Sequence, residues 1–294
     1  MRITLKQLEV FIAVAQEGNV TRAASQLSIT QSATSMALAD FETQLGRKLF
    51  DRVGKRLQLN DTGRLLLPKA IDTVARASEI ESLAGHSEVM GNLRIGASLT
   101  IGNYVMPRLI GSYMRQHPGS KLQLKVTNTR HIVQELQQFH IDIGFIEGFC
   151  HEPDIEVTPW CEDELVIFAG PDHPLASKKN VTETDLSEAE WILREPGSGT
   201  REVFDNAVLG KISKLNLLME LSHTEAIQRV VESGIGISCS SRLTLVEALQ
   251  QGTVVALNTP FLNLKREFFI LVHRQKYRTQ GLEEFLGYCR TALN

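Results

Sequence analysis

The 294-residue sequence is poor in cysteine, and its four cysteines form no CxxC pair. That spacing excludes a disulfide framework and a zinc-binding motif. One Cys, one His and one Glu within residues 147–151 are too few ligands for a metal. We therefore expect free, buried or half-exposed thiols and no metal or other cofactor. The cysteines are Cys150, Cys161, Cys239 and Cys289.

Long apolar runs are also missing. Residues 1–18, MRITLKQLEVFIAVAQEG, contain charged and polar side chains throughout, so they provide neither a signal-peptide core nor a membrane span. No histidine stands in a nucleophile, base and orienter arrangement that the sequence supports. We expect a cytoplasmic protein that has no membrane partner and is not an enzyme.

Charge is distributed unevenly along the chain. Residues 1–64 carry nine Lys and Arg against six Asp and Glu, a net charge of +3, whereas the whole chain carries -3 and the remainder therefore -6. A basic amino-terminal unit on an acidic body is the charge layout of a polyanion-binding head joined to a unit with another task.

Three short helices are predicted near the amino terminus. Apolar residues recur at helical spacing over residues 4–18, then from Asn19, and again from Thr30 to Gly46, with a tight turn at residues 28–29. Asn19 and Thr30 are suited to cap their helices. An alternating hairpin with glycine at its turn follows over residues 48–60. The alternative is a plain helical bundle with one polar face.

Two helices joined by so short a turn match the helix-turn-helix, whose second helix lies in the DNA major groove. Glutamine can pair with adenine through two hydrogen bonds, and serine and threonine can contact bases or phosphates. A basic hairpin beside that helix would straddle phosphates or enter the minor groove. The predicted DNA-contacting residues are Thr30, Gln31, Ser32, Thr34, Ser35, Arg52, Lys55 and Arg56.

One long helix is expected from residue 61 to Gly85, interrupted only by Pro68. Its apolar stripe is too long for the small head to cover, so we expect a helix from a second subunit to pack against it. Packing on its own body is the alternative.

From residue 93 the pattern changes to strands that alternate with helices, which predicts an α/β fold with a parallel or mixed sheet in two lobes. Ligands of such sheets bind at the carboxyl ends of the strands, where loops meet helix amino termini.

Several motifs stand in a characteristic order along the chain: TLKQLEVFIAV, TRAASQL, LGRKLFDR and LNDTG near the amino terminus, and DIGFIEG, WILREPGSGTRE and HRQK in the body. In these motifs the sequence resembles the LysR-type transcriptional regulators, closest to the YeiE-like branch of that family. The resemblance implies a winged helix-turn-helix (residues 1–60), a dimerising linker helix (61–88) and a two-lobed effector domain (89–294) similar to type 2 periplasmic binding proteins. It places lobe 1 at about 89–163 and 266–294, and lobe 2 at about 164–265.

The resemblance also implies double-stranded promoter DNA as a partner, a homodimer through the linker helix, assembly into a homotetramer, and a small effector between the lobes. Many relatives have Pro at the position of Ser32 and Arg at that of Met36. Contacts made by those two residue types cannot be carried over, so the operator sequence stays open. A solute-binding receptor is one alternative, which the basic head and the lack of a signal-peptide core oppose. An enzyme such as a small-acid dehydratase is another.

Two hydroxyl-rich loops, SLTIG at residues 98–102 and PGSGTR at 196–201, each follow a strand and open a helix. Helix amino termini favour anions, so we expect a small oxyanion, such as sulfite or sulfate, or a short carboxylate. Glu147 would repel an anion unless Arg201 or a protonated effector pairs with it. A tight turn with a threonine cap is the alternative for the second loop. The predicted effector contacts are Ser98, Thr100, Glu147, Ser198, Thr200, Arg201 and Thr224.

Overall fold

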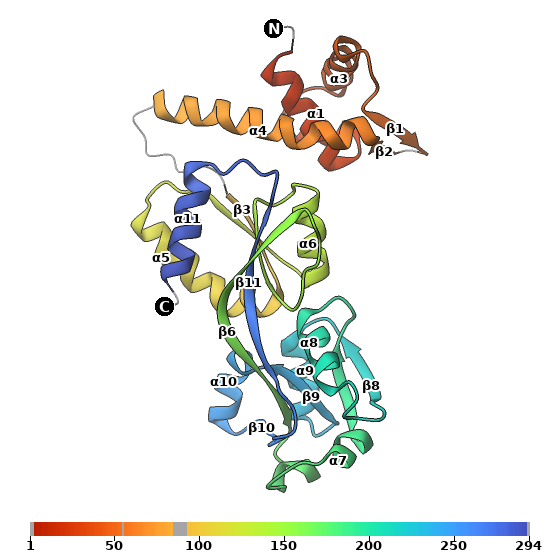
Figure 1. Ribbon diagram of the computed structural model, residues 1–294, viewed down its shortest axis with the longest axis vertical. Coiled ribbons are helices and arrows are strands. Elements are labelled where there is room, and N and C mark those ends of the chain that lie inside the picture. The colour runs from red at the N-terminus through yellow and green to blue at the C-terminus, as the bar shows by residue number, and fades with distance from the viewer. Residues whose placement is uncertain (1–2, 55, 85–92, 293–294) are drawn as a thin grey trace.

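The computed structural model describes residues 3–54, 56–84 and 93–292. It places a helical head above a two-lobed body, with one long helix lying across the base of the head (Figure 1). Lys55 and the expected boundary at residues 88 and 89 lie outside the described residues.

The head forms the three helices and the hairpin that the sequence predicts. Thr4 and Gln7 form a capping box at the first helix, and Asn19 and Thr30 accept hydrogen bonds from the backbone at the starts of the next two. Gly18 ends the first helix at φ 58°, a left-handed conformation that favours glycine. The elements are α1 (Leu5–Glu17), α2 (Val20–Gln26), α3 (Gln31–Leu45), β1 (Phe50–Val53) and β2 (Arg56–Leu59).

Three phenylalanines fill the centre of the head. The ring of Phe11 lies 5.7 Å from those of Phe41 and Phe50, so α1, α3 and β1 meet at one cluster. Phe139 of the body is 4% exposed and packs in the same core, and Gln16 Nε2 donates to its carbonyl oxygen at 3.3 Å. The head is therefore docked on the body through its own core.

The long helix, α4 (Asp61–Ala84), contains Pro68 and packs mainly on α1. Leu67, Ala70 and Ile71 are buried against the head, whereas Leu65 and Ile80 are 74% and 69% exposed. Among the described residues no helix is long and apolar enough to cross a membrane.

The body is built on one mixed sheet with the strand order β4-β3-β5-β11-β6-β9-β7-β8, and β10 pairs with β6. β3 runs parallel to β4 and β5 in lobe 1, and β7 runs parallel to β8 and β9 in lobe 2. The body strands are β3 (Leu93–Ala97), β4 (Leu122–Val126), β5 (Ile143–Glu147), β6 (Ile155–Ala169), β7 (Glu190–Arg194), β8 (Asn216–Leu221), β9 (Ile237–Ser241), β10 (Val255–Ala256) and β11 (Lys265–His273). The body helices are α5 (Met106–Gln116), α6 (Thr129–Gln137), α7 (Glu183–Glu188), α8 (Gly199–Val208), α9 (Thr224–Glu232), α10 (Arg242–Gln251) and α11 (Gln280–Thr291), with a π-helical turn at Ile101–Val105 and a 3₁₀ turn at Pro174–Ser177.

β11 pairs along its whole length with residues 155–164 of β6, and both strands run from one lobe into the other (Figure 1). The sequence predicts only residues 164–169 of β6, because Pro159 and the acidic run at 162–164 hide the earlier part of the strand. The sequence pattern does not predict β11 at all. The lobes are thus joined by two long strands that pass through the expected lobe boundaries.

A buried carboxylate holds lobe 1 together near the head. Asp142 is 4% exposed and accepts hydrogen bonds at 2.8 Å from Arg94 Nη2 and from Lys276 Nζ. Burial alone would raise the pKa of Asp142, but the hydrogen bond from Arg94 and the charge of Lys276 outweigh it and lower the pKa to about 2.

Asp142→Asn is expected to lower the stability of lobe 1 by about 2 kcal/mol at neutral pH. Because the pKa is depressed in the folded state, this contribution is present above the pKa of an unfolded aspartate and is lost as pH falls towards 2. Urea midpoints followed through the fluorescence of Trp160 should therefore converge for the two proteins at acidic pH. Exposed Asp154 provides the control, since Asp154→Asn should leave the midpoint unchanged. A pH-independent difference for Asp142→Asn would contradict the charge argument.

Candidate functional site

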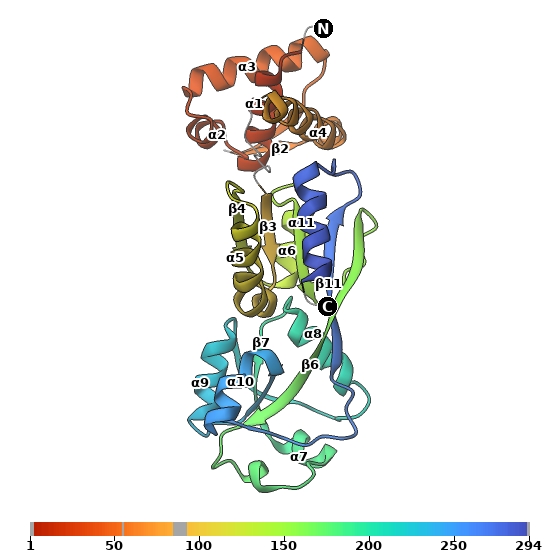
Figure 2. The same cartoon turned by 90° about the vertical axis from the view of Figure 1, so that its left-hand side faces the viewer.

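The outer face of α3 is the first candidate surface, and it points away from the body (Figure 2). Gln31, Ser32 and Ser35 are exposed on it, as the sequence predicts for a DNA-reading helix. Met36 is 63% exposed on the same face, and Asp40 follows it one turn later. Met36 is not the arginine that many relatives carry at this position, so the family resemblance assigns it no DNA contact.

Thr34 is not where a DNA-contacting residue would have to be, because its side chain lies on the inner face of α3. It is 0% exposed and its hydroxyl donates to the carbonyl oxygen of Thr30 at 3.0 Å. Leu38 and Phe41 follow Thr34 at spacings of four and seven residues and are also buried, so Thr34 lies on the stripe of α3 that packs on the head core. Thr34 therefore has a structural role. Thr30 is exposed and caps α3, accepting from Ala33 N at 3.2 Å.

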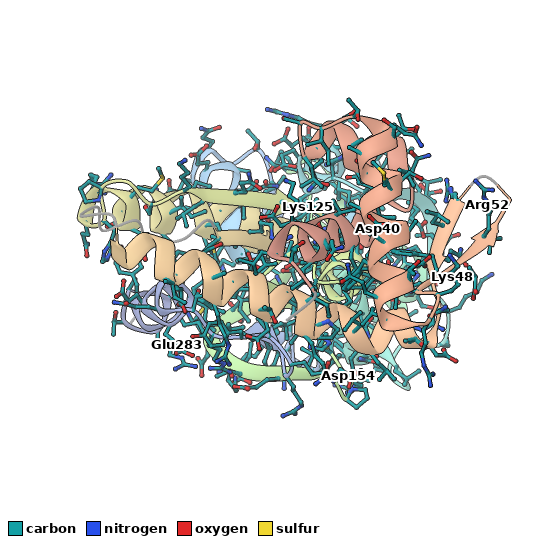
Figure 3. The ribbon with its side chains drawn as sticks, turned by 90° about the horizontal axis from the view of Figure 1, so that it is seen from above. Asp40, Lys48, Arg52, Lys125, Asp154 and Glu283 are labelled. Atoms are coloured by element: carbon teal, nitrogen blue, oxygen red, sulfur yellow. The ribbon has the colours of Figure 1, made fainter. Side chains whose placement is uncertain are left out.

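The β1–β2 hairpin forms a basic wing beside α3. Arg52 and Arg56 are exposed on it, and Arg52 projects near its tip (Figure 3). Glu42 ties this hairpin to α3, since one carboxylate oxygen accepts from Leu49 N at 2.9 Å and the other from Lys48 Nζ at 2.7 Å. The position of the wing relative to α3 is thus fixed by a buried charge-assisted hydrogen bond.

A second polar cluster lies between the lobes, at the carboxyl ends of β3 and β5. Ser98 follows β3, and its hydroxyl donates to the carboxylate of Glu147 at the end of β5. Glu147 N donates back to Ser98 Oγ at 3.2 Å, and both residues are at most 1% exposed. Ser98 is therefore the side chain that the described residues bring to the carboxylate of Glu147.

Lobe 2 closes on this cluster with the amino terminus of α8. Gly199 N donates at 3.2 Å to the hydroxyl of Thr129, which donates at 2.8 Å to the carbonyl oxygen of Glu147. Ser198 caps α8 by accepting from Arg201 N at 3.4 Å. Thr129 is not among the residues predicted from the sequence, although it too opens a helix shortly after a strand, as Thr100 and Thr224 do.

Arg201 does not face Glu147. Its Nε donates to the carboxylate of Asp205 at 2.9 Å, and its Nη1 donates to the carbonyl oxygen of Arg194 at 2.9 Å. Of the two partners expected for Glu147, the structure does not bring Arg201 to it, because an acceptor one helical turn further along α8 already holds the guanidinium. The other expectation, a protonated effector, stays a prediction.

Arg266 is the cation that the structure places beside the cluster. Its Nε donates to Asp163 at 2.6 Å and its Nη1 donates to Thr200 Oγ1 at 3.0 Å. The side chain is 2% exposed. Strand alternation was the available signal, because Arg266 occupies the same face of KREFF as the buried Phe268.

Thr100 and Thr224 are also buried, at 2% and 5% exposure. Thr100 precedes the π-helical turn, where Gly102 N donates to Ser98 O at 2.7 Å. Thr224 is the first residue of α9. Six of the seven predicted effector residues therefore lie at strand ends or helix starts, and all six are buried.

The cysteines are free thiols, as predicted: Cys239 and Cys289 are buried and the other two are half-buried. Burial raises the pKa of Cys161 to about 11 and that of Cys289 to about 12, so these thiols stay protonated and unreactive at neutral pH. Within the described residues no group of three or more His, Cys, Asp or Glu could hold a metal ion.

The chain matches protein-family models, curated proteins and solved structures. Residues 5–64 match the bacterial regulatory helix-turn-helix protein, lysR family, and residues 86–294 match the LysR substrate binding domain. The uncharacterized HTH-type transcriptional regulator YeiE of Escherichia coli (strain K12) is 47% identical over 99% of both chains.

Solved structures show the same fold. A full-length OxyR variant from Pseudomonas aeruginosa superimposes with a TM-score of 0.74 over 98% of each chain at 23% identity. The regulatory domain of CcmR from Synechocystis PCC6803, in complex with 2-PG, gives 0.64 over 69% of this chain and 97% of that domain at 31% identity. The curated relatives are named transcriptional regulators, and regulators of this kind bind DNA and small effectors and are not enzymes. The chain belongs to the LysR family of bacterial helix-turn-helix transcriptional regulators.

Proposed function

We propose that the protein is a sequence-specific DNA-binding regulator whose DNA binding or bending is controlled by a small anionic effector held between its lobes. The observation that carries this proposal is the pairing of two surfaces: an exposed polar α3 with a basic wing, and a buried set of hydroxyls where α8 closes on β5. CcmR, whose regulatory domain holds 2-PG, supports a small molecule as the ligand of such a body.

The DNA contacts follow from the exposed face of α3. Gln31 would pair with adenine, Ser32 and Ser35 would contact bases or phosphates, and Met36 would pack on a thymine methyl group. The carboxylate of Asp40 would accept from cytosine N4. Arg52 and Arg56 of the wing would neutralise phosphates, and we propose the same role for Lys55.

The effector contacts are the hydroxyls of Ser98, Thr100, Ser198 and Thr200, with Glu147 at the end of β5 and Thr224 at the start of α9. Small hydroxyls and helix amino termini suit a sulfur oxyanion or a short carboxylate. The exposed Leu65 and Ile80 of α4 fit a homodimer through this helix, and we extend this to a homotetramer in the cytoplasm.

Two variants separate base reading from phosphate binding. Gln31→Ala should cost about 1–3 kcal/mol on the specific site and little on random DNA. Arg52→Ala should weaken binding to both and reduce the slope of log K against log salt by about 1. Fluorescence anisotropy with promoter DNA from beside the gene and with random DNA, over a salt series, measures both effects.

Lys214→Ala is the matched control, because it removes the same charge from an exposed position in lobe 2. Equal losses on specific and random DNA for Gln31→Ala would refute its assignment as the base-reading residue. No binding to any upstream DNA at low salt would overturn the proposed function. A change of affinity or bending on adding sulfite, sulfate or a short carboxylate would support the effector part.

A further inference from the structure

We propose that the effector must carry both a negatively charged oxygen and a hydrogen-bond donor, as a monoprotonated oxyanion does, and that Arg266 and Glu147 read these two features. This inference rests on the proposed interlobe effector site and deepens it by naming the chemical class of ligand. It also makes Arg266, which neither the motifs nor the family resemblance assigns, a ligand-binding residue.

Arg266 has one donor group that the protein leaves unused. Its Nε and Nη1 are held by Asp163 and Thr200, but its Nη2 is buried and has no hydrogen-bond partner among the described residues. A buried guanidinium nitrogen without an acceptor costs free energy, so an acceptor supplied by a ligand would bind favourably there. The anchoring by Asp163, itself held by Ser241 at 2.7 Å, fixes where that acceptor must lie.

Glu147 presents the opposite chemistry. Its side chain is buried, and within the described residues the hydroxyl of Ser98 is the only side-chain donor to its carboxylate. An ionised carboxylate offers about four acceptor positions, so it can take a further donor from a ligand. A ligand oxygen without a proton would instead face a buried negative charge and be repelled.

The two groups are connected through the closing contact between the lobes. Gly199 approaches the backbone of Glu147, and its neighbour Thr200 accepts from Arg266. Asp163 already balances the charge of Arg266, so Glu147 leaves this cluster with a net charge of -1. A fully deprotonated, doubly charged oxyanion is therefore disfavoured, whereas an oxyanion that keeps a proton satisfies Arg266 Nη2 and Glu147 together.

Titration calorimetry of the full chain with three probes tests the ligand class. The probes are inorganic phosphate, sulfate, and sulfite at pH values below and above the pKa at which hydrogen sulfite loses its proton. Phosphate and hydrogen sulfite keep a proton near neutral pH, and sulfate has none. We expect sulfate to bind at least about a hundredfold more weakly than the better of the other two. Glu147→Gln replaces the carboxylate by an amide that can donate, so it should improve sulfate binding at least about tenfold and weaken the protonated probes.

Arg266 is tested in the double variant Asp163→Asn/Arg266→Gln, which removes both charges and leaves no unpaired buried carboxylate. All probes should lose at least about tenfold in affinity, with thermal melting confirming a folded body. Arg242→Gln, at an exposed arginine paired with Glu164, is the matched control and should bind like wild type.

The outcomes separate the inference from the proposed function. If wild type binds sulfate as well as the protonated probes, or if Glu147→Gln does not change the preference, the donor requirement is wrong. Wild-type affinity in the folded double variant would refute the role of Arg266. If wild type binds none of the probes but still binds promoter DNA, the anionic effector itself is wrong and the inference fails with it.

Discussion

Gly199→Ala is expected to hold the two lobes apart and to abolish the effector response. A Cβ atom at this position would lie 1.8 Å from the carbonyl oxygen of Glu147 and 2.5 Å from its carbonyl carbon. Both are backbone atoms of β5, so no side-chain rotation relieves the clash. The first turn of α8 must move away, and the hydrogen bond from Gly199 to Thr129 is lost with it.

The size of the effect follows from the residues that the contact between α8 and β5 holds in place. Separating α8 from β5 removes Ser198 and Thr200 from the side of Ser98 and Glu147, so a ligand could engage only one lobe at a time. We expect effector affinity to fall at least about a hundredfold, equivalent to about 2.7 kcal/mol. Calorimetry measures the affinity, and small-angle scattering should show a larger radius of gyration that effector no longer reduces.

Gly287→Ala is the matched control, because a Cβ there meets nothing within 4 Å on the exposed side of α11. It should bind effector normally and gain stability, by about 0.5–1 kcal/mol, since alanine favours the helix. Unchanged effector affinity in a folded Gly199→Ala protein would show that closure of α8 on β5 is not part of effector binding.

The head could be predicted closely from the sequence, because its signals are local. Thr4, Asn19 and Thr30 cap helices whose apolar faces follow in the next few residues, and Gly18 stops the first helix where φ becomes positive. What the pattern did not show is which hydroxyl of α3 faces inward. Ser32 and Ser35 are exposed and Thr34 is buried, a distinction set by how α3 packs on α1 and α2.

The sequence predicts which loops form the interlobe site, but it does not predict which charged side chain lies beside them. Strand ends and helix starts mark Ser98 and Thr200, and both lie where α8 closes on β5. Arg201 is adjacent to the loop in sequence but is held by Asp205, while Arg266 comes from a strand 66 residues beyond Thr200. Only the pairing of β11 with β6, which sets Arg266 beside Asp163, brings that guanidinium to the site.

Phe11→Ala is expected to unfold the head and eliminate DNA binding. The side chain is 0% exposed and contacts two other rings, and truncating such a phenylalanine costs about 3–5 kcal/mol. A folded unit as small as the head has a low free energy of unfolding. A loss of about 3–5 kcal/mol therefore approaches or exceeds that whole free energy. Hydrogen exchange by residue range should show lost protection in α1 and α3, and anisotropy should show loss of binding to specific and random DNA alike.

Leu5→Ala is the control, because Leu5 is on the same helix but 44% exposed, and it should retain DNA binding. The Phe11 variant also tests how the head is held on the body. Phe139 packs in the core that Phe11 organises, so loss of that core should expose Phe139 and raise exchange at the end of α6 as well. If α1 and α3 lost protection while the residues around Phe139 kept theirs, the head and lobe 1 would be independent in stability, and effector closure could not reach the DNA through this contact.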